Sequence, residues 1–322
     1  MTTLVTPSIR PFQEQDYPAV LAVWNAVYAD YPWSVEAARH EDSRYDGTRL
    51  HLRRFVAEAE DAVVGVTEFH HVANMYHPHK FWTGLDVHPA WQGRGIGSAL
   101  YDRLLRELVP YRPQVLWVNV RETFRRSLPF AGHRGFREVR RAWESRLDVN
   151  RFDPVPFRAD ADRGSRGLAI VTVASEQTGD AEWLQKLYEL HTEVAADIPQ
   201  PEPYTPMTIE EFRRRWFENH PEYLPEGHFL AKHEGRYVAE SNLFRSAELD
   251  DVLYQGITGT RRAYRGRGVA LALKLHTIAY ARARGKREIR TWNDTLNAPM
   301  LAINTRLGFV RQPAWITFEK TF

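Results

Sequence analysis

The chain contains 322 residues, a length typical of two domains of about 150 residues each. Hydrophobic residues make up 43% of it and charged residues 26%, which excludes a largely disordered protein. Its 43 basic and 41 acidic residues leave a formal charge of +2, so the charge balance indicates no nucleic-acid partner. The absence of cysteine excludes disulfides, thiolate catalysis and cysteine-ligated zinc.

The first residues and the apolar runs of the chain indicate no membrane partner. Residues 1–12 lack a basic stretch followed by an apolar stretch, so no secretory signal is expected. No apolar run approaches the roughly 18 residues that span a bilayer. The longest run, Val269 to Ala281, is interrupted by Lys274 and His276. We therefore expect a cytoplasmic protein.

In chain order, the first half alternates short strands with amphipathic helices. A polar region rich in proline and aromatic residues follows the first helix, and a later strand runs directly into a glycine-rich turn. The helix after this turn has apolar residues at four-residue steps, which predicts one buried face. The expected elements are a strand near Ile9, a helix over Tyr17–Tyr28, the polar region Tyr31–His51, strands over Arg54–Ala59 and Val63–Val72, a helix marked by Ile96, Leu100, Leu104 and Leu108, and a strand over Val115–Val120.

The second half shows the same order of elements after a segment of linker character. Residues 150–168 are rich in proline, glycine and charge and have no hydrophobic period, which is typical of a linker. The expected elements that follow are a strand over Ile170–Val173, a helix over Ala181–Val194, a polar region over Ile198–Pro225, strands over His228–His233 and Tyr237–Phe244, a helix marked by Leu271, Leu275 and Ile278, and a strand over Glu288–Trp292.

Two landmarks recur at one spacing and indicate that a whole domain is duplicated. A glycine-rich turn begins at Gln92 and again at Arg265, and a Gly-Phe pair begins at Gly135 and again at Gly308. The distance between the landmarks is 43 residues in each half, and one offset of 173 residues superimposes both halves. We expect a mixed α/β domain present twice, over residues 1–150 and 169–322, with a linker over residues 151–168.

The glycine-rich turns have the chemistry of an anion site. Glycine lets the chain turn tightly and lets a ligand approach the backbone closely. The first N–H groups of the following helix lack internal acceptors and carry the positive end of the helix dipole. Arg94 and Arg267 add a cation beside each turn, so we expect the ligand to be a pyrophosphate. The alternative interpretation is that these turns only connect a strand to a helix and bind no ligand.

The turn sequences select among pyrophosphate ligands. A third glycine at the dinucleotide-binding spacing is missing from both turns, and so is the Gly-Lys-Ser/Thr ending of the nucleotide phosphate loop. The segments Gln92-Gly-Arg-Gly95-Ile-Gly97 and Arg265-Gly-Arg-Gly268-Val-Ala270 instead resemble the acyl-CoA-binding motif of the GNAT N-acetyltransferase superfamily, Arg/Gln-x-x-Gly-x-Gly/Ala between a strand and a helix. The order of Asn297, Asn304 and Gly308-Phe309 adds to the resemblance, with Asn304 where tyrosine usually stands.

The resemblance implies two tandem GNAT-like domains, each a mixed, mostly antiparallel sheet flanked by helices. It implies acetyl-CoA as co-substrate, bound by the glycine turn and by main-chain groups of the preceding strand, and direct attack by an amine of a small molecule. The second half is expected to be the better catalyst because it alone keeps the asparagine pair. The residues expected to bind the coenzyme are Leu85, Val87, Gln92, Gly93, Arg94, Gly95, Gly97, Thr258, Thr260, Arg265, Gly266, Arg267, Gly268, Ala270 and Asn297.

The catalytic residues are harder to place from sequence. An attacking amine needs a proton acceptor, and Glu240 and Asp251 on neighbouring predicted strands are the candidates, although exposed strand carboxylates are commoner. Asn304 lies where the proton donor of the family usually stands. The histidines at positions 70, 71, 77 and 79 fit no familiar zinc spacing, so no metal is expected. Asn297 could cap a helix as well as touch the coenzyme.

Two other functions fit the same motifs. A non-catalytic acyl-CoA-binding or sensing protein would explain why neither half has the usual tyrosine. An acetyltransferase that acts on protein termini or lysines would show an open groove in place of a closed pocket. The sequence is compatible with a monomer or a homodimer.

Overall fold

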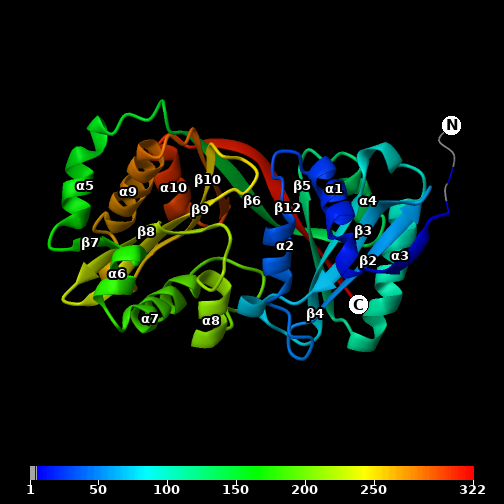
Figure 1. Cartoon of the computed structure of the whole chain (residues 1–322). Coiled ribbons are helices and arrows are strands. Elements are labelled where there is room, and N and C mark those ends of the chain that lie inside the picture. Colours follow the sequence, from blue (N-terminus) through cyan, green and yellow to red (C-terminus); the bar gives the residue numbers. More distant parts are fainter. Residues whose placement is uncertain (1–3, 5) are drawn as a thin grey trace. The chain divides into compact units, whose positions relative to one another are not determined.

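The computed structural model describes residue 4 and residues 6–322, and it groups them into two compact units (Figure 1). Unit 1 comprises the chain as far as Arg140 together with Ile316–Phe322, and unit 2 comprises Arg141–Trp315. The expected division of the sequence into two domains, over residues 1–150 and 169–322, stays a prediction. Among the helices of residues 6–322, none combines the length and the apolar character of a membrane-spanning segment.

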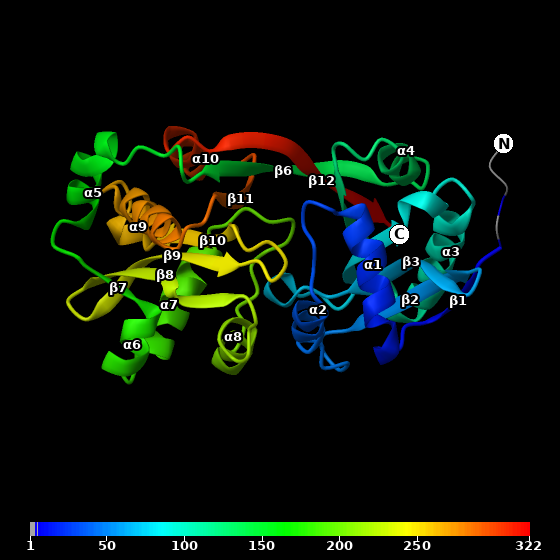
Figure 2. The ribbon, with the colours of Figure 1, turned by 45° about the horizontal axis from the view of Figure 1, so that its top comes forward.

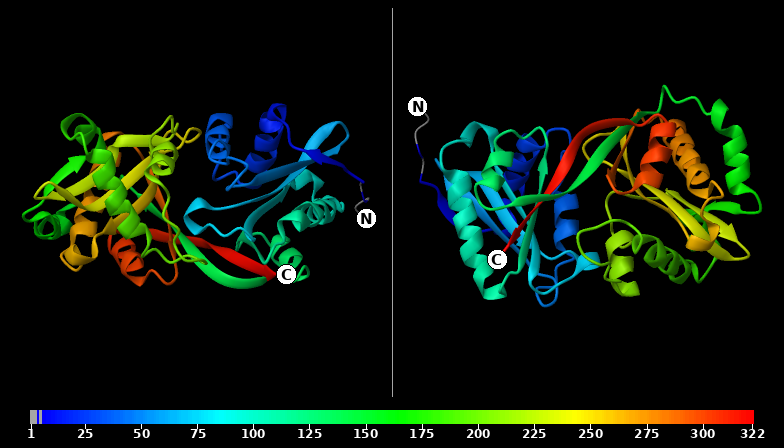
Figure 3. Two further views of the ribbon diagram at one scale, coloured as in Figure 1. Left: turned by 90° about the horizontal axis from the view of Figure 1, so that it is seen from below. Right: turned by 180° about the vertical axis from the view of Figure 1, so that it is seen from behind.

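Unit 1 is a mixed sheet with helices on both faces. Its strands follow the order β1-β2-β3-β4-β5-β12. Seen from below, α1 and α2 lie on one side of these strands and α3 on the other (Figure 3, left). The elements are β1 (Ser8–Pro11), α1 (Tyr17–Val27), α2 (Val35–Asp42), β2 (Leu52–Ala59), β3 (Ala62–His70), β4 (Lys80–Val87), α3 (Ile96–Leu108), β5 (Val115–Arg121), α4 (Ser127–Gly132) and the end of β12 (Val310–Thr321).

Unit 2 repeats this plan. Its strands follow the order β6-β11-β10-β9-β8-β7. Helix α9 lies on one side of them, and α7 and α8 lie on the other (Figure 2). The elements are β6 (Arg137–Asp148), α5 (Arg158–Ser165), β7 (Ala169–Thr172), α6 (Val173–Gly179), α7 (Trp183–Ala195), α8 (Ile209–Trp216), β8 (Tyr223–His233), β9 (Arg236–Arg245), β10 (Val252–Thr260), α9 (Val269–Ala283), β11 (Glu288–Asp294), α10 (Ala298–Arg306) and the start of β12.

Among the described residues, the strands of each unit include a parallel pair beside antiparallel pairs, and these parallel strands diverge. In unit 1, β4 pairs with β5 over Lys80–Thr83 only, while β4 continues to Val87. In unit 2, β10 pairs with β11 over Val252–Tyr254 and then continues to Thr260. Because the strands separate beyond these points, side chains and backbone at the divergence can face a ligand. The mixed, mostly antiparallel sheets expected from the sequence are confirmed.

Strands β6 and β12 correspond to each other, 173 residues apart. β6 belongs to the first half of the sequence, but most of it forms part of unit 2. β12 belongs to the second half, but its end forms part of unit 1. The later part of β6 pairs with β11 in unit 2, with Leu147 opposite Ile289. The end of β12 lies beside β5 in unit 1, where Thr317 donates to Asn119 (2.8 Å) and Glu319 accepts from Trp117 (2.8 Å). Unit 1 therefore contains the last seven residues of the chain.

Residues 150–168, expected to be a linker, fold as part of unit 2. They contain α5, which packs on α9 so closely that a Cβ on Gly164 would lie 2.5 Å from the carbonyl oxygen of Gly268. Asp160 of α5 accepts from Arg306 of α10 at 2.5 Å. The low helix propensity of this segment is therefore offset by tertiary contacts, which no local pattern of hydrophobicity reports.

Candidate active site

The glycine turn of unit 1 forms an uncapped helix start. Gly93 and Gly95 have φ of +80° and +92°, in the left-handed region that side chains disfavour. Gly95 is the N-cap of α3, and as a glycine it makes no side-chain cap hydrogen bond to the first amides of this helix. Gln92 holds the turn by donating to the carbonyl of Val87 at 3.0 Å. The turn therefore presents backbone N–H groups and the positive end of the α3 dipole.

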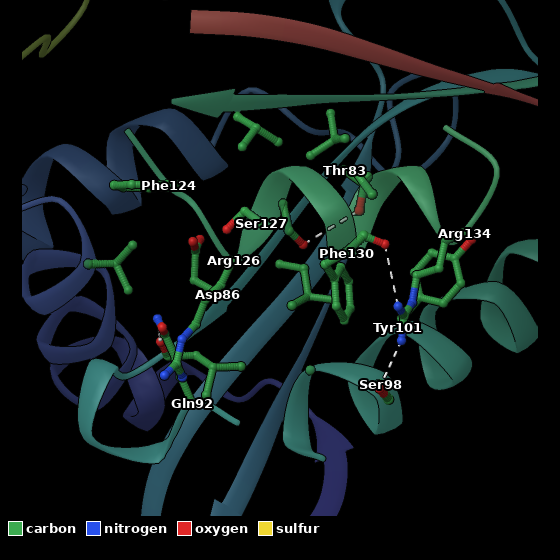
Figure 4. Close-up of a pocket in the computed structure, with 18 of the residues that line it drawn as sticks. Thr83, Asp86, Gln92, Ser98, Tyr101, Phe124, Arg126, Ser127, Phe130 and Arg134 are labelled. Atoms are coloured by element: carbon green, nitrogen blue, oxygen red, sulfur yellow. Dashed lines mark hydrogen bonds between the residues drawn. The ribbon is translucent and has the colours of Figure 1, made fainter. Parts of the chain in front are cut away.

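A cavity of about 710 Å³ begins at this turn and follows the divergence of β4 from β5. Leu85, Val87, Gln92, Gly93, Gly95 and Gly97 line it, so the structure brings together most of the coenzyme-binding residues expected in the first half. Figure 4 shows Asp86, Gln92 and Arg126 on one side of the cavity and Ser98, Tyr101, Phe130 and Arg134 on the other.

Arg94, which we expected to supply the cation beside the bound ligand, contacts neighbouring residues of the turn instead. Its guanidinium covers the Trp91 ring at 4.6 Å and donates to the carbonyl of Ala90, and Arg94 is not among the residues that line the cavity. The cations that line it are Arg125, Arg126 and Arg134, which the sequence analysis missed. A Cβ added to Gly93 would lie 3.2 Å from the Arg126 guanidinium, which places that cation directly at the glycine turn.

Asp86 supplies a carboxyl group to the cavity, and the sequence analysis missed this residue as well. It lies on β4 between Leu85 and Val87, and its Oδ1 accepts a 2.9 Å hydrogen bond from the Tyr28 hydroxyl of the adjacent loop after α1. Burial raises the pKa of Asp86 to about 7, helped by the nearby Glu68 carboxylate and opposed by the Tyr28 hydrogen bond. A carboxyl with a pKa near neutrality can both accept and release a proton under physiological conditions.

The glycine turn of unit 2 copies the backbone of the first. Gly266 and Gly268 have φ of +74° and +87°, and Gly268 is the N-cap of α9 without a side-chain cap. Arg265 donates to the carbonyl of Thr260 (3.0 Å), as Gln92 does to Val87. Arg267 covers the Tyr264 ring and donates to Ala263, which matches the placement of Arg94.

The surroundings of this second turn differ from those of the first. Helix α5 packs against Gly268 and Ala272. Thr258 shares a hydrogen bond with Ser241 (2.8 Å), and the hydroxyl of Thr260 is buried with no hydrogen-bond partner among the described residues. Ala270 lies in the first turn of α9. Asn297 caps α10 by accepting from the Met300 amide at 3.3 Å.

The structure brings none of the expected catalytic residues into the unit 1 cavity. Asn304 is buried on α10 and donates to Asn293 at 2.6 Å. Asp251 precedes β10, at the end opposite the glycine turn, where its hydrogen bond with Arg287 (2.6 Å) lowers its pKa.

Glu240 is fully buried on β9, within 3.2 Å of both His191 Nδ1 and His228 Nε2. Burial disfavours its charged form, but attraction to these two imidazoles and their hydrogen bonds outweigh burial and lower the pKa of Glu240 to about 2. Glu240 therefore holds a fixed negative charge. Among the residues that the structure describes, no group of three histidine, aspartate or glutamate side chains could hold a metal ion.

Comparison with known proteins identifies the family. The chain matches the acetyltransferase (GNAT) family over residues 20–136 and again over residues 184–309. The mycothiol acetyltransferase of Amycolatopsis mediterranei (strain U-32) is 28% identical over 309 residues, which cover 91% of each chain. The mycothiol acetyltransferase of Thermobispora bispora is 26% identical over 244 residues, which cover 73% of this chain and 75% of that protein.

Solved structures share the fold over nearly the whole chain, at lower identity. A tandem GNAT protein from the clavulanic acid biosynthesis pathway covers 98% of this chain and 98% of its own, with a TM-score of 0.77 and 20% identity. A GCN5-related N-acetyltransferase from Sphaerobacter thermophilus covers 99% and 97%, with a TM-score of 0.72 and 20% identity. The tandem fold expected from the 173-residue repeat is thereby confirmed. The chain belongs to the acetyltransferase (GNAT) family and is an N-acetyltransferase.

Proposed function

We propose that the protein transfers an acetyl group from acetyl-CoA to an amine of a small molecule, and that the transfer takes place in unit 1. The observation that carries this proposal is the cavity that joins the glycine turn at Gly93 and Gly95 to the carboxyl of Asp86. One end of this cavity suits a diphosphate, and its interior holds a group able to take a proton. The names of the mycothiol acetyltransferase relatives support a small-molecule acceptor.

The residues of the cavity fit coenzyme A. Left-handed glycines leave room for a ligand against the backbone, and the uncapped start of α3 offers N–H donors to a diphosphate. Arg125, Arg126 and Arg134 supply cations for phosphate groups. When bound, the thioester supplies the acetyl group, with the thiol as its leaving group.

Asp86 serves as the general base in this proposal. An amine that arrives as an ammonium ion must lose a proton before it can attack, and a carboxylate near neutral pKa is suited to take that proton. The Tyr28 hydroxyl holds the Asp86 carboxyl in place by donating to Oδ1. Tyr28 and Phe124 also line the cavity with their rings 5.5 Å apart, so an ammonium group could lie against aromatic faces.

Unit 2 in this proposal supports the fold without carrying out the transfer, which departs from our expectation for the second half. The residue that corresponds to Asp86 is Gly259, and a Cβ there would lie 2.0 Å from Val194 of α7. A carboxylate side chain therefore has no room at this place. The nearest buried acid, Glu240, is held as an anion by two histidines.

The proposal is tested by thiol release from acetyl-CoA across a panel of small amines. Asp86→Asn should lower kcat by about 10²- to 10⁴-fold, the range typical of a lost general base, with little change in affinity for acetyl-CoA. Asp102→Asn, which changes an exposed carboxylate of α3, is the control and should keep full activity.

Other outcomes would point to the two rival functions. If the protein bound acetyl-CoA and released no thiol with any amine, a non-catalytic acyl-CoA-binding protein would be supported. If only peptides were acetylated, at their N-termini or lysines, the acceptor class would be wrong. If Asp86→Asn kept its full rate, another group would have to be the base.

A further inference from the structure

The wall of the unit 1 cavity between α3 and α4 is held by a residue from the far end of the chain. Lys320, in the last strand, donates from Nζ to the Tyr101 hydroxyl (2.9 Å) and to the carbonyl of Arg134 (2.9 Å). Both partners line the cavity. Arg134 in turn lies 3.5 Å above the Phe130 ring and donates to Ser98 Oγ at 2.8 Å (Figure 4). One ammonium group therefore anchors a connected part of the wall.

The hydrogen bond from Lys320 fixes what the Tyr101 hydroxyl can do. An ammonium group has only donors, so the phenol oxygen must accept, and its own hydrogen stays available. Within residue 4 and residues 6–322, the Tyr101 hydroxyl has no protein acceptor. Tyr101 is only 7% exposed and is one of the residues that line the cavity, so this buried donor lies close to space that a ligand can occupy. A buried donor without an acceptor is costly, and a bound ligand would relieve that cost.

The position in unit 2 that corresponds to Tyr101 carries no phenol group. The residue that corresponds to Tyr101 is Lys274, and the residue that corresponds to Lys320 is Leu147, each 173 positions away. Lys274 Nζ lies 5.0 Å from the Phe309 ring, and Lys320 Nζ lies 6.0 Å from the corresponding ring of Phe136. An ammonium group therefore stands near the same phenylalanine in both units, but only in unit 1 does it come from the last strand and support a hydroxyl.

We propose that Tyr101 donates a hydrogen bond to the acyl-CoA bound in the unit 1 cavity, and that Lys320 is the positioning residue that orients this hydroxyl. This inference rests on the proposed function of unit 1 and adds a ligand-binding residue to it. It also makes the end of β12 a functional part of the site, because Lys320 belongs to the last seven residues.

The test measures the affinity of the full-length protein for acetyl-CoA by titration calorimetry. Tyr101→Phe removes only the hydroxyl, and Lys320→Met removes the ammonium while keeping the length of the side chain. Each should weaken binding by about threefold to tenfold, as expected for one hydrogen bond. The double variant should be no weaker than the worse single variant, because both remove the same interaction. Lys320→Arg, which retains a donor, should restore affinity to within about twofold of the wild type.

Matched measurements separate a positioning role from a purely structural one. Glu319→Gln changes the neighbouring residue on the opposite face of β12, and it should leave affinity for acetyl-CoA unchanged. If Lys320→Met lowers the melting temperature, the result for Tyr101→Phe decides the question, since this variant removes only the hydroxyl. Unchanged affinity in Tyr101→Phe would overturn the inference, and so would losses that add in the double variant.

The failure of this inference is distinguishable from failure of the proposed function. If the wild-type protein binds acetyl-CoA and Gly93→Ala weakens binding, the glycine turn is the coenzyme site whatever Tyr101 does. Only the absence of binding by the wild-type protein, or binding insensitive to the turn, would remove the proposed function together with this inference.

Discussion

Asp86 and Gly259 occupy the same position in the two copies of one fold, 173 residues apart, and only Asp86 carries a carboxylate. In unit 1, Asp86 lies opposite Val66 across the β3–β4 pair. In unit 2, Gly259 lies opposite Glu240 across the β9–β10 pair. Each unit therefore has one acid in this cross-strand pair, which lies on β4 in unit 1 and on β9 in unit 2. Burial raises the pKa of Asp86, whereas His191 and His228 outweigh burial and lower the pKa of Glu240.

The raised pKa of Asp86 makes folding stability depend on pH. The carboxyl ionises near pH 3.8 in the unfolded chain and near pH 7 in the folded protein, so stability falls as pH rises from about 4 to about 7. Asp86→Asn removes this cost. We expect the variant to be more stable than the wild type at pH 8, by at most about 4 kcal/mol, and equally stable at pH 4. Denaturant unfolding at both pH values checks this. An equal gain at pH 4 would contradict the raised pKa.

The lowered pKa of Glu240 predicts the opposite dependence. Its contribution to stability is present above about pH 4.5 and is lost as the pH falls towards about 2. Glu240→Gln should therefore destabilise the protein at pH 7, by about 3 kcal/mol or more, because two buried imidazoles lose their anionic acceptor. The difference from the wild type should shrink between pH 4.5 and the acid limit of folding. Glu234→Gln, at an exposed site in the β8–β9 turn, serves as the control.

The two glycine turns offer a matched pair of variants. Gly93 and Gly266 have φ of +80° and +74°, so alanine adds similar backbone strain at both, about 1 kcal/mol. The Cβ of Gly93→Ala would meet the Arg126 guanidinium at 3.2 Å, whereas the Cβ of Gly266→Ala would meet nothing within 4 Å. We expect Gly93→Ala to weaken acetyl-CoA binding by about tenfold and Gly266→Ala to leave it unchanged, measured by calorimetry. Equal losses would show that both turns bind the coenzyme.

The close packing of α5 on α9 is tested at Gly164. A Cβ there would lie 2.5 Å from the Gly268 carbonyl oxygen and 2.9 Å from the Cβ of Ala272, so Gly164→Ala should lower stability by about 1–3 kcal/mol. At Gly179, the last residue of α6, an added Cβ meets nothing within 4 Å, and Gly179→Ala should be neutral or stabilising. Thermal unfolding compares the two. A neutral Gly164→Ala would indicate that residues 150–168 do behave as a loose linker.

The sequence predicts the repeating features of the fold well because these depend on local chemistry. The apolar steps at Ile96, Leu100, Leu104 and Leu108 predict the buried face of α3, and all four residues are buried. The glycine spacing places both turns between a strand and a helix, as the structure confirms. Helix ends are predicted to within a few residues, as in α1, which ends at Val27 where the pattern predicts Tyr28.

The site could be predicted only in part, because its remaining members depend on contacts between distant segments. Alternation along β4 predicts that Asp86 faces away from Leu85 and Val87. Its burial and its raised pKa, however, depend on packing with Tyr28, which lies 58 residues away. The contact of Lys320 with Tyr101 spans 219 residues. Asn304 shows the converse, because the family pattern selects it while its side chain pairs with Asn293 in a buried position.

The placement of the last seven residues beside β5 has a consequence for how the protein is made. While the ribosome is still translating unit 2, β5 has no neighbour on its outer side, and such an unpaired edge can attract strands of other chains. Unit 1 is therefore finished last although most of it is synthesised first. Expression of residues 1–150 alone should yield an aggregation-prone fragment, and supplying Ile316–Phe322 as a separate peptide should improve its solubility.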